Sequence, residues 1–102
     1  MATAYIREYA DLAVTFGKHL QAGAEPAIAD QAVSTSGTSA QSNAFNANTR
    51  FIAISTPAAQ AVCALFGTNP TALTASSLRL PANSIIFFGV QPGHKVALID
   101  VT

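Results

Sequence analysis

The sequence predicts an all-β fold, a small jelly-roll-like β-sandwich with an extended N-terminal arm. Its 102 residues suffice for one domain and are too few for two separate cores. Five short runs of β-branched and aromatic residues fill the second half, spaced about ten residues apart. Pro, Gly and Asn separate these runs, as turns between strands require. We therefore assign residues 1–24 to the arm and residues 25–102 to the sandwich.

The N-terminal segment fits two secondary structures. Apolar residues of 4–16 recur at helical spacing, but they also alternate as in a strand. Gly17 and Gly23 then interrupt the pattern. We predict an extended arm with a short strand, ordered by a partner; the alternatives are a helix over 4–16, or a first strand that completes the domain's own core. Aromatic and aliphatic side chains carry most interface energy, so the predicted anchors are Tyr5, Ile6, Tyr9, Leu12 and Phe16.

The next segment combines a strand with a long polar stretch. Residues 27–33 are expected to form a short strand, and residues 34–48 a surface loop with an edge strand. Phe45 is the only large apolar side chain of that stretch. We expect it to pin the loop to the core.

The remaining strands are predicted over residues 49–56, 60–66, 78–81, 83–90 and 95–101. Gln91-Pro92-Gly93-His94 has the Pro and Gly positions of a type II turn. One face of the four best strands should supply the core, built from Phe51 or Ile52, Ile54, Val62, Leu65, Ile86, Phe88, Val96 and Leu98.

Two of these strands, 83–90 and 95–101, carry apolar residues on both faces. A two-layer sandwich buries only one side of each sheet. The second apolar face needs a cover, and a neighbouring chain would supply it. We therefore expect a homo-oligomer, with a trimer as the favoured state.

Composition excludes several classes of function. Five basic and five acidic residues give a formal charge of zero, without the basic stretch of a nucleic-acid binder. No run approaches the roughly 18 apolar residues of a membrane span, and charges near the start argue against a signal peptide. We expect a protein made in a cytosol-like compartment. Only 10% of its residues are charged, against about 25% in typical domains, which suits a crowded assembly.

Enzymatic chemistry has little support. His19 is expected in a loop and His94 in a turn, and the lone Cys63 is predicted to be a small buried hydrophobe within a strand. No pair has the spacing of zinc ligands, and no glycine-rich phosphate motif occurs. Glu8 and Asp11 are interpreted as solvated carboxylates near Arg7. We expect no catalytic residues, no metal and no cofactor.

Two isolated cations, Arg50 and Arg79, are flanked by apolar residues. Each could lie along a sheet edge with its guanidinium in water. Alternatively, each could form an interchain salt bridge, with Asp30 and Glu25 as candidate partners. Both arginines are kept as candidate interface residues.

A family resemblance covers roughly Glu25 to Val101. The segments SAQSNAFNANTRFIAIST and ALFGTNPTALTASSLRLPANSIIFFGVQPGHKVALIDV resemble small virion proteins encoded among the head genes of tailed phages. The shared pattern includes S-A-Q-S, T-R-F-I, F-G-x-N-P, R-L-P-A-N and PGxKVA. Residues 1–21 carry no matching motif, which leaves the docking mode open.

The resemblance implies a non-enzymatic decoration or cement protein. Such proteins bind the outside of the capsid lattice, commonly as trimers, and have no catalytic residues. The implied partners are the chain itself and the major capsid protein, without nucleic acid or membrane. The implied location is the capsid surface, after assembly in the host cytoplasm. A head–tail connector, tail or fibre-base protein is the main alternative, and a ligand-binding β-sandwich is a further one.

Overall fold

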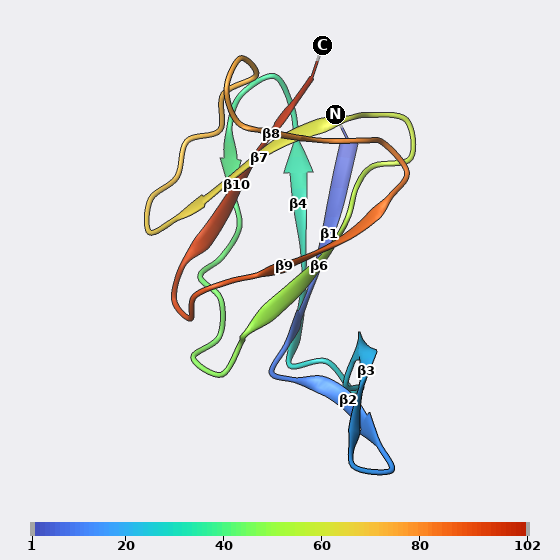
Figure 1. Cartoon of the computed structure of the whole chain (residues 1–102). Helices are drawn as coiled ribbons and strands as arrows, with labels where there is room; N and C mark the ends of the chain where they lie inside the picture. Colours follow the sequence, from blue (N-terminus) through green and yellow to red (C-terminus); the bar gives the residue numbers. More distant parts are fainter. Residues whose placement is uncertain (1, 102) are drawn as a thin grey trace.

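The structure, a computed structural model, describes residues 2–101, without the side chains of residues 15 and 19–21. It is an all-β sandwich of two four-stranded antiparallel sheets, with a two-stranded hairpin projecting from one end (Figure 1). The predicted fold class is confirmed. The β1 sheet has the order β4-β1-β6-β9, formed by Ala29–Thr35, Ala2–Tyr9, Phe51–Ser55 and Ile85–Gly89. The β10 sheet has the order β5-β10-β7-β8, formed by Ala40–Gln41, Lys95–Asp100, Val62–Gly67 and Leu78–Leu80. The hairpin pairs β2, Leu12–Thr15, with β3, Lys18–Gly23.

Strands from distant parts of the sequence interleave in both sheets. From β4 to β10 the chain changes sheet at every connection except that between β7 and β8. This alternation is that of a jelly roll built from two Greek keys. The place between β4 and β6, which the last strand of a jelly roll occupies, is filled here by the first strand. The two chain ends meet accordingly, because Ala2 pairs with Thr35 and the Asp100 amide donates to the Ser36 carbonyl at 2.8 Å.

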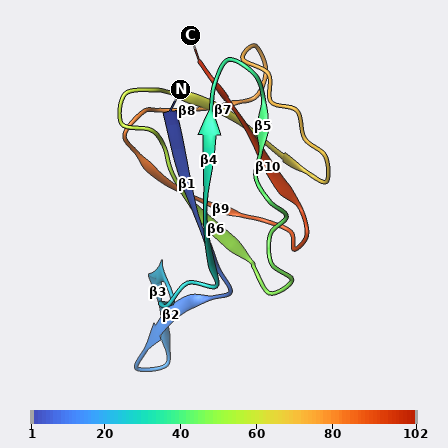
Figure 2. The same cartoon turned by 180° about the vertical axis from the view of Figure 1, so that it is seen from behind.

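The expectation of an arm is wrong for the residues of β1. This strand pairs along its length with β4 and over Tyr5–Tyr9 with β6, so it is central to its sheet (Figure 2). Its side chains alternate, and Ile6 is buried at 1% exposure. The helical alternative is wrong as well. The remaining alternative is the one observed, since β1 completes the core as the first strand.

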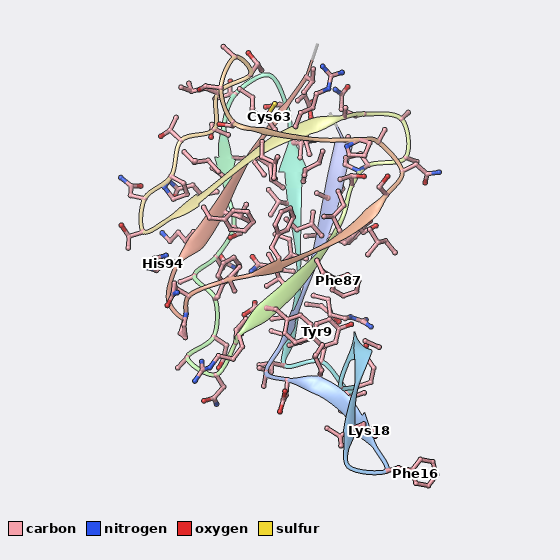
Figure 3. The ribbon with its side chains drawn as sticks, viewed as in Figure 1. Tyr9, Phe16, Lys18, Cys63, Phe87 and His94 are labelled. Carbon is pink, nitrogen blue, oxygen red and sulfur yellow. The ribbon has the colours of Figure 1, made fainter. Side chains whose placement is uncertain are left out.

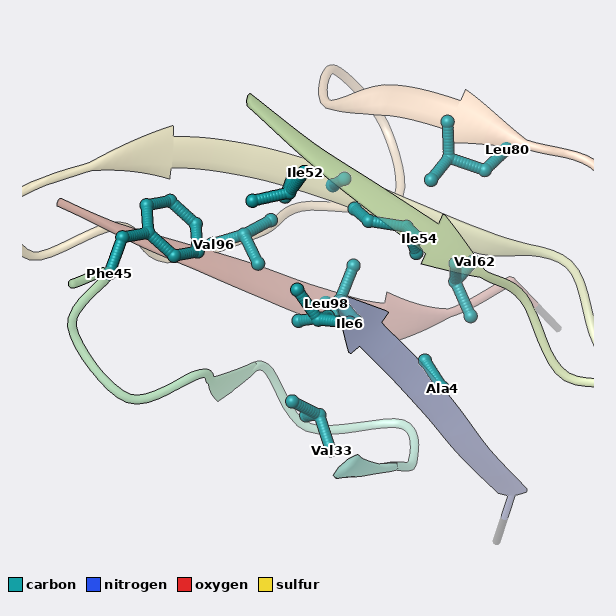
Figure 4. Close-up of a cluster of buried hydrophobic side chains, with 11 residues drawn as sticks. Ala4, Ile6, Val33, Phe45, Ile52, Ile54, Val62, Leu80, Val96 and Leu98 are labelled. Atoms are coloured by element: carbon teal, nitrogen blue, oxygen red, sulfur yellow. The ribbon is translucent and has the colours of Figure 1, made fainter. Parts of the chain in front are cut away.

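The core lies between the two sheets and is entirely apolar at its centre (Figure 4). Five predicted core residues are fully buried: Ile52, Ile54, Val62, Val96 and Leu98. Ile86 and Phe88 are half-buried and pack against this cluster. Leu65 was expected in the core but is 42% exposed, because the alternation of β7 turns Val62, Ala64 and Phe66 inward instead. Phe45 is also buried in the cluster, which confirms that it pins its loop.

The outer face of the β10 sheet is covered in part by the chain's own loop, residues 68–77, while Leu65 on the same face stays exposed. Gln41 Nε2 donates to the Pro70 carbonyl at 2.7 Å, and the Ala72 amide donates to Ser39 Oγ at 2.9 Å. Further along, Cys63 Sγ lies 4.0 Å from the Thr74 carbonyl. Since β10 lies between β5 and β7, the loop passes over it, and Ala97 is 0% exposed. The chain's own loop thus covers Ala97 on the outer face of β10, and a neighbouring chain over the rest of that face stays a prediction.

Glu8 is a buried carboxylate, which corrects its interpretation as a solvated group. It is 3% exposed and points inward at the hairpin end of the sandwich. Its Oε1 accepts hydrogen bonds from the Asn46 amide and the Thr49 hydroxyl, both at 2.8 Å, and its Oε2 accepts one from Gln31 Nε2 at 3.3 Å. Buried carboxylates are tolerated where donors satisfy them. Glu8 thus fixes the loop of residues 43–49 to β1.

Candidate interaction surface

The outer face of the β1 sheet is hollowed into a groove along β6. The sheet register places the small side chain of Ser55 between Tyr5 and Ile85, and that of Ala53 between Arg7 and Phe87. Small residues on β6 therefore form the floor, and larger residues on β1 and β9 form the walls. The resulting groove has a volume of about 690 Å³.

The walls of the groove are apolar and largely open to solvent. Tyr5 is 60% exposed, Ile85 67% and Phe87 54%. Scattered exposed apolar residues are ordinary, but a contiguous group around a hollow is typical of a binding surface. The expectation of an apolar second face on residues 83–90 is met here, because no part of the described chain covers Ile85 and Phe87.

An aromatic stack closes the groove at the hairpin end. Tyr9 and Phe51 are cross-strand partners whose ring centroids lie 5.1 Å apart at an interplanar angle of 18°. Phe51 also contacts Phe87, with centroids 6.4 Å apart. Aromatic pairs of this kind add to the stability gained from burial alone. Tyr9, which lines the end of the groove, is therefore held by the stack with Phe51.

A charged rim runs along the β4 side. Arg7 Nε donates to Asp30 Oδ1 at 2.7 Å, and its Nη1 lies 3.4 Å from Glu25 Oε2. The Tyr9 hydroxyl donates to the same Glu25 oxygen at 2.7 Å. Burial, and then this hydrogen bond, raise the pKa of Tyr9 above its ordinary value. All three charged side chains are about half exposed, so the pairs orient the rim more than they stabilise the fold.

This rim corrects the expected partners of Arg50 and Arg79. Asp30 and Glu25 bind Arg7 of the same chain. Arg50 is exposed and lies 3.4 Å from the carbonyl oxygens of Ala47 and Thr49. Arg79 is exposed on β8, in the opposite sheet. Neither arginine lines the groove, and their role as interface residues stays a prediction.

The hairpin β2–β3 is attached beside the closed end of the groove. The Ala24 amide donates to the Asp11 carbonyl at 3.0 Å where the hairpin leaves the sandwich. Gly23 lies against the Tyr9 ring so closely that a Cβ there would overlap it. Because Gly23 has no side chain, β3 can pack against that ring. Phe16 and Gly17 form the tip with φ values of 49° and 75°, and Phe16 is 99% exposed (Figure 3).

The predicted anchors are thus divided among three places. Tyr5 and Tyr9 line the groove, Ile6 belongs to the core, and Leu12 and Phe16 belong to the hairpin. Ile6 cannot be an interface anchor because it is buried. Ala53, Ile85 and Phe87 are not among the predicted interface residues, although the run Ile85–Phe88 predicts the second apolar face to which two of them belong. Four consecutive apolar residues in a strand place two of them on the outer face.

Among the residues that the structure describes, no cluster of side chains suggests a catalytic or metal site. No three His, Cys, Asp or Glu side chains in that part come together as metal ligands would. Cys63 is buried, as expected, and His94 is half-buried in its turn. The side chain of His19 lies outside the described residues. Between residues 2 and 101, no helix is long and apolar enough to span a membrane.

No family model matches the chain, and no curated protein or solved structure matches it significantly.

Proposed function

We propose that this chain is a non-enzymatic structural protein of a tailed-phage virion, a decoration or cement protein. It oligomerises, as a trimer in the favoured case, and binds the lattice of the major capsid protein from outside. The observation that carries the proposal is the uncovered apolar groove beside a projecting hairpin, on a chain of zero net charge. The resemblance of residues 25–101 to small phage head proteins supports it.

Low charge suits a protein that is crowded on a lattice. Many copies packed side by side would accumulate repulsion if each carried a large charge of one sign. Only 10% of this chain is charged, and its rim charges are already paired within the chain. Contacts between such copies must then rely on apolar and hydrogen-bonded surface, which the groove and hairpin supply.

Cosedimentation with capsids tests the proposal. Purified protein is mixed with capsids that lack it, and bound protein is quantified against the major capsid protein. A decoration protein saturates at a stoichiometry fixed by the lattice and raises the temperature at which the capsid opens. Absence of binding to any capsid preparation would refute the proposal.

A different position in the virion is the main alternative. A connector, tail or fibre-base protein forms a single ring or a local cluster and so occurs in few copies per particle. Quantitative mass spectrometry of purified virions separates the two, since a decoration protein is present in large excess over any connector.

A ligand-binding module is the second candidate because the groove joins exposed aromatics to a polar rim. Tyr5 and Phe87 could stack on a sugar face while Arg7 and Asp30 provide hydrogen bonds. A glycan array, followed by titration of any hit, tests this candidate. Loss of binding in Tyr5→Ala would support it, and an array without hits would remove it.

A further inference from the structure

Phe16 has an unfavourable conformation that yields no contact within its own chain. It occupies the first position of the two-residue hairpin turn with a positive φ of 49°. Turns with two positive φ values favour Asn-Gly or Asp-Gly, and a bulky residue there is strained. The Phe16 side chain is nevertheless 99% exposed. The Phe16 ring, called the knob below, therefore projects into solvent and packs against none of the described residues of its own chain.

The groove, called the socket below, is lined by apolar side chains that are open to solvent. Its apolar walls, Tyr5, Ile85 and Phe87, are more than half exposed, and none of the side chains that the structure describes fills the space above Ala53. The hairpin extends away from the groove (Figure 3), and at its base Gly23 packs against the Tyr9 ring. Figure 3 shows Phe16 at the far end of the hairpin, remote from Tyr9 and Phe87.

We propose that Phe16 of one copy inserts into the groove of a second copy of this chain. The charges beside the two surfaces are complementary. Arg7, Asp30 and Glu25 give the rim a net charge of −1, from one positive and two negative groups. Lys18 places +1 two residues from Phe16 on the exposed hairpin. Insertion would bring this ammonium toward the rim carboxylates and the aromatic ring between Tyr5 and Phe87.

The contact joins two different surfaces, so it is head-to-tail. Such contacts close into rings when the rotation between copies permits, and otherwise extend into filaments. One Phe buries only about 150–250 Å², and a stable interface needs about 800 Å² per partner. The flanks of the hairpin must therefore contribute, and Val14 there is 57% exposed. This inference deepens the self-association in the proposed function and rests on it.

Paired variants test the contact by light scattering and analytical ultracentrifugation. Phe16→Asp removes the knob, Phe87→Asp disables the socket, and Leu73→Asp is the matched control at an exposed apolar position, 55% exposed. We expect the first two variants to raise the dissociation constant by about tenfold or more, as hot-spot losses do, and the control to behave as wild type. The thermal melt of Phe16→Asp should stay unchanged, since this side chain is 99% exposed. That of Phe87→Asp should remain cooperative and fall only slightly, because this variant also loses the contact with Phe51.

Mixing the two defective variants gives the sharpest result. The intact knob of Phe87→Asp fits the intact socket of Phe16→Asp, so the mixture should form a one-to-one dimer that cannot close into a ring. A mixture that stays monomeric refutes the head-to-tail contact. So does a wild type that is monomeric at all concentrations, an unaffected Phe16→Asp oligomer, or an equal loss in Leu73→Asp.

A fluorescent variant keeps the test readable if an Asp variant fails to fold. The chain has no Trp, so Phe16→Trp introduces a single reporter. Its emission should shift to the blue as the protein associates. The shift should vanish in the double variant that carries both Phe16→Trp and Phe87→Asp. Emission of a solvent-exposed Trp at concentrations where oligomers form would overturn the proposal.

Capsid binding separates this inference from the proposed function. If Phe16→Asp still self-associates but no longer cosediments with capsids, the knob docks on the capsid protein, and the inference is wrong while the function stands. If the wild type self-associates through Phe16 but binds no capsid, the inference stands and the function is wrong.

Discussion

Replacing Glu8 by Ala should destabilise the whole sandwich, although Glu8 belongs to no active site. The substitution deprives the Thr49 hydroxyl, 0% exposed, and the Asn46 amide of their acceptor. Each buried donor left unpaired costs about 1–3 kcal/mol. Asn46 is exposed, so water can serve its amide, whereas the buried Thr49 hydroxyl is left unpaired; we therefore expect a loss of up to about 3 kcal/mol.

This loss is large compared with the roughly 5–15 kcal/mol of a typical domain. It corresponds to a fall in Tm of about 12–24 °C for a chain of this size. Urea denaturation followed by circular dichroism gives the free energy of unfolding, and differential scanning calorimetry gives Tm. Glu8→Gln should lose only about 1 kcal/mol, because one oxygen can still serve Asn46 and Thr49.

Asp11→Ala is the matched control, because Asp11 is an exposed carboxylate three residues away that accepts one local hydrogen bond from the Leu12 amide. It should change stability by about 0.5 kcal/mol or less. A Glu8→Ala variant that loses less than about 1 kcal/mol, or no more than Asp11→Ala, would show that Glu8 does not hold the loop. A double-mutant cycle with Thr49→Val should give a coupling of about 0.5–3 kcal/mol.

Three further predictions follow from the fold. A variant without the hairpin, in which two glycines join Asp11 to Ala24, should keep the cooperative melt. Deletion of residues 1–9 should instead abolish folding, and the reverse pair of results would show that β1 is dispensable. Ile54→Asp should yield no soluble folded protein, because an unpaired buried carboxylate costs several kcal/mol, and a cooperative melt of this variant would contradict the core assignment. The raised pKa of Tyr9 stabilises the folded state below the unfolded pKa of about 10, and this contribution is lost as pH rises through the folded pKa. In urea titrations the free energy of unfolding should therefore decline more steeply at alkaline pH for wild type than for Tyr9→Phe. Parallel declines would refute the contribution of Tyr9.

The sequence determined most strand positions because their signals are local. Alternation and turn residues placed β6, β7, β8, β9 and β10 within a few residues of their observed bounds. The type II turn is also as expected, since Gly93 has a φ of 80° and the His94 amide donates to the Gln91 carbonyl at 3.2 Å. Such features depend on the backbone preferences of a few adjacent residues, which can be read from the sequence alone.

The candidate site could be predicted only in part. Tyr5, Tyr9 and Phe16 were recognised as aromatic residues in a segment of ambiguous structure, but their separation into groove and hairpin was not. Ile85 and Phe87 were recognised as part of a strand with two apolar faces. That their outer face lies beside Tyr5 depends on the pairing of β1, β6 and β9, which are far apart in the sequence.

Tertiary structure alone decided which apolar faces are covered. β9 and β10 look alike in sequence, yet loop 68–77 buries Ala97 on β10 while Phe87 on β9 stays exposed. The same holds for Glu8 and Asp11, three residues apart, of which only Glu8 meets donors from a distant loop. Local propensity fixes where a strand runs and which residues share a face. Whether that face meets water, a loop or another strand depends on contacts between residues distant in sequence, which no local pattern encodes.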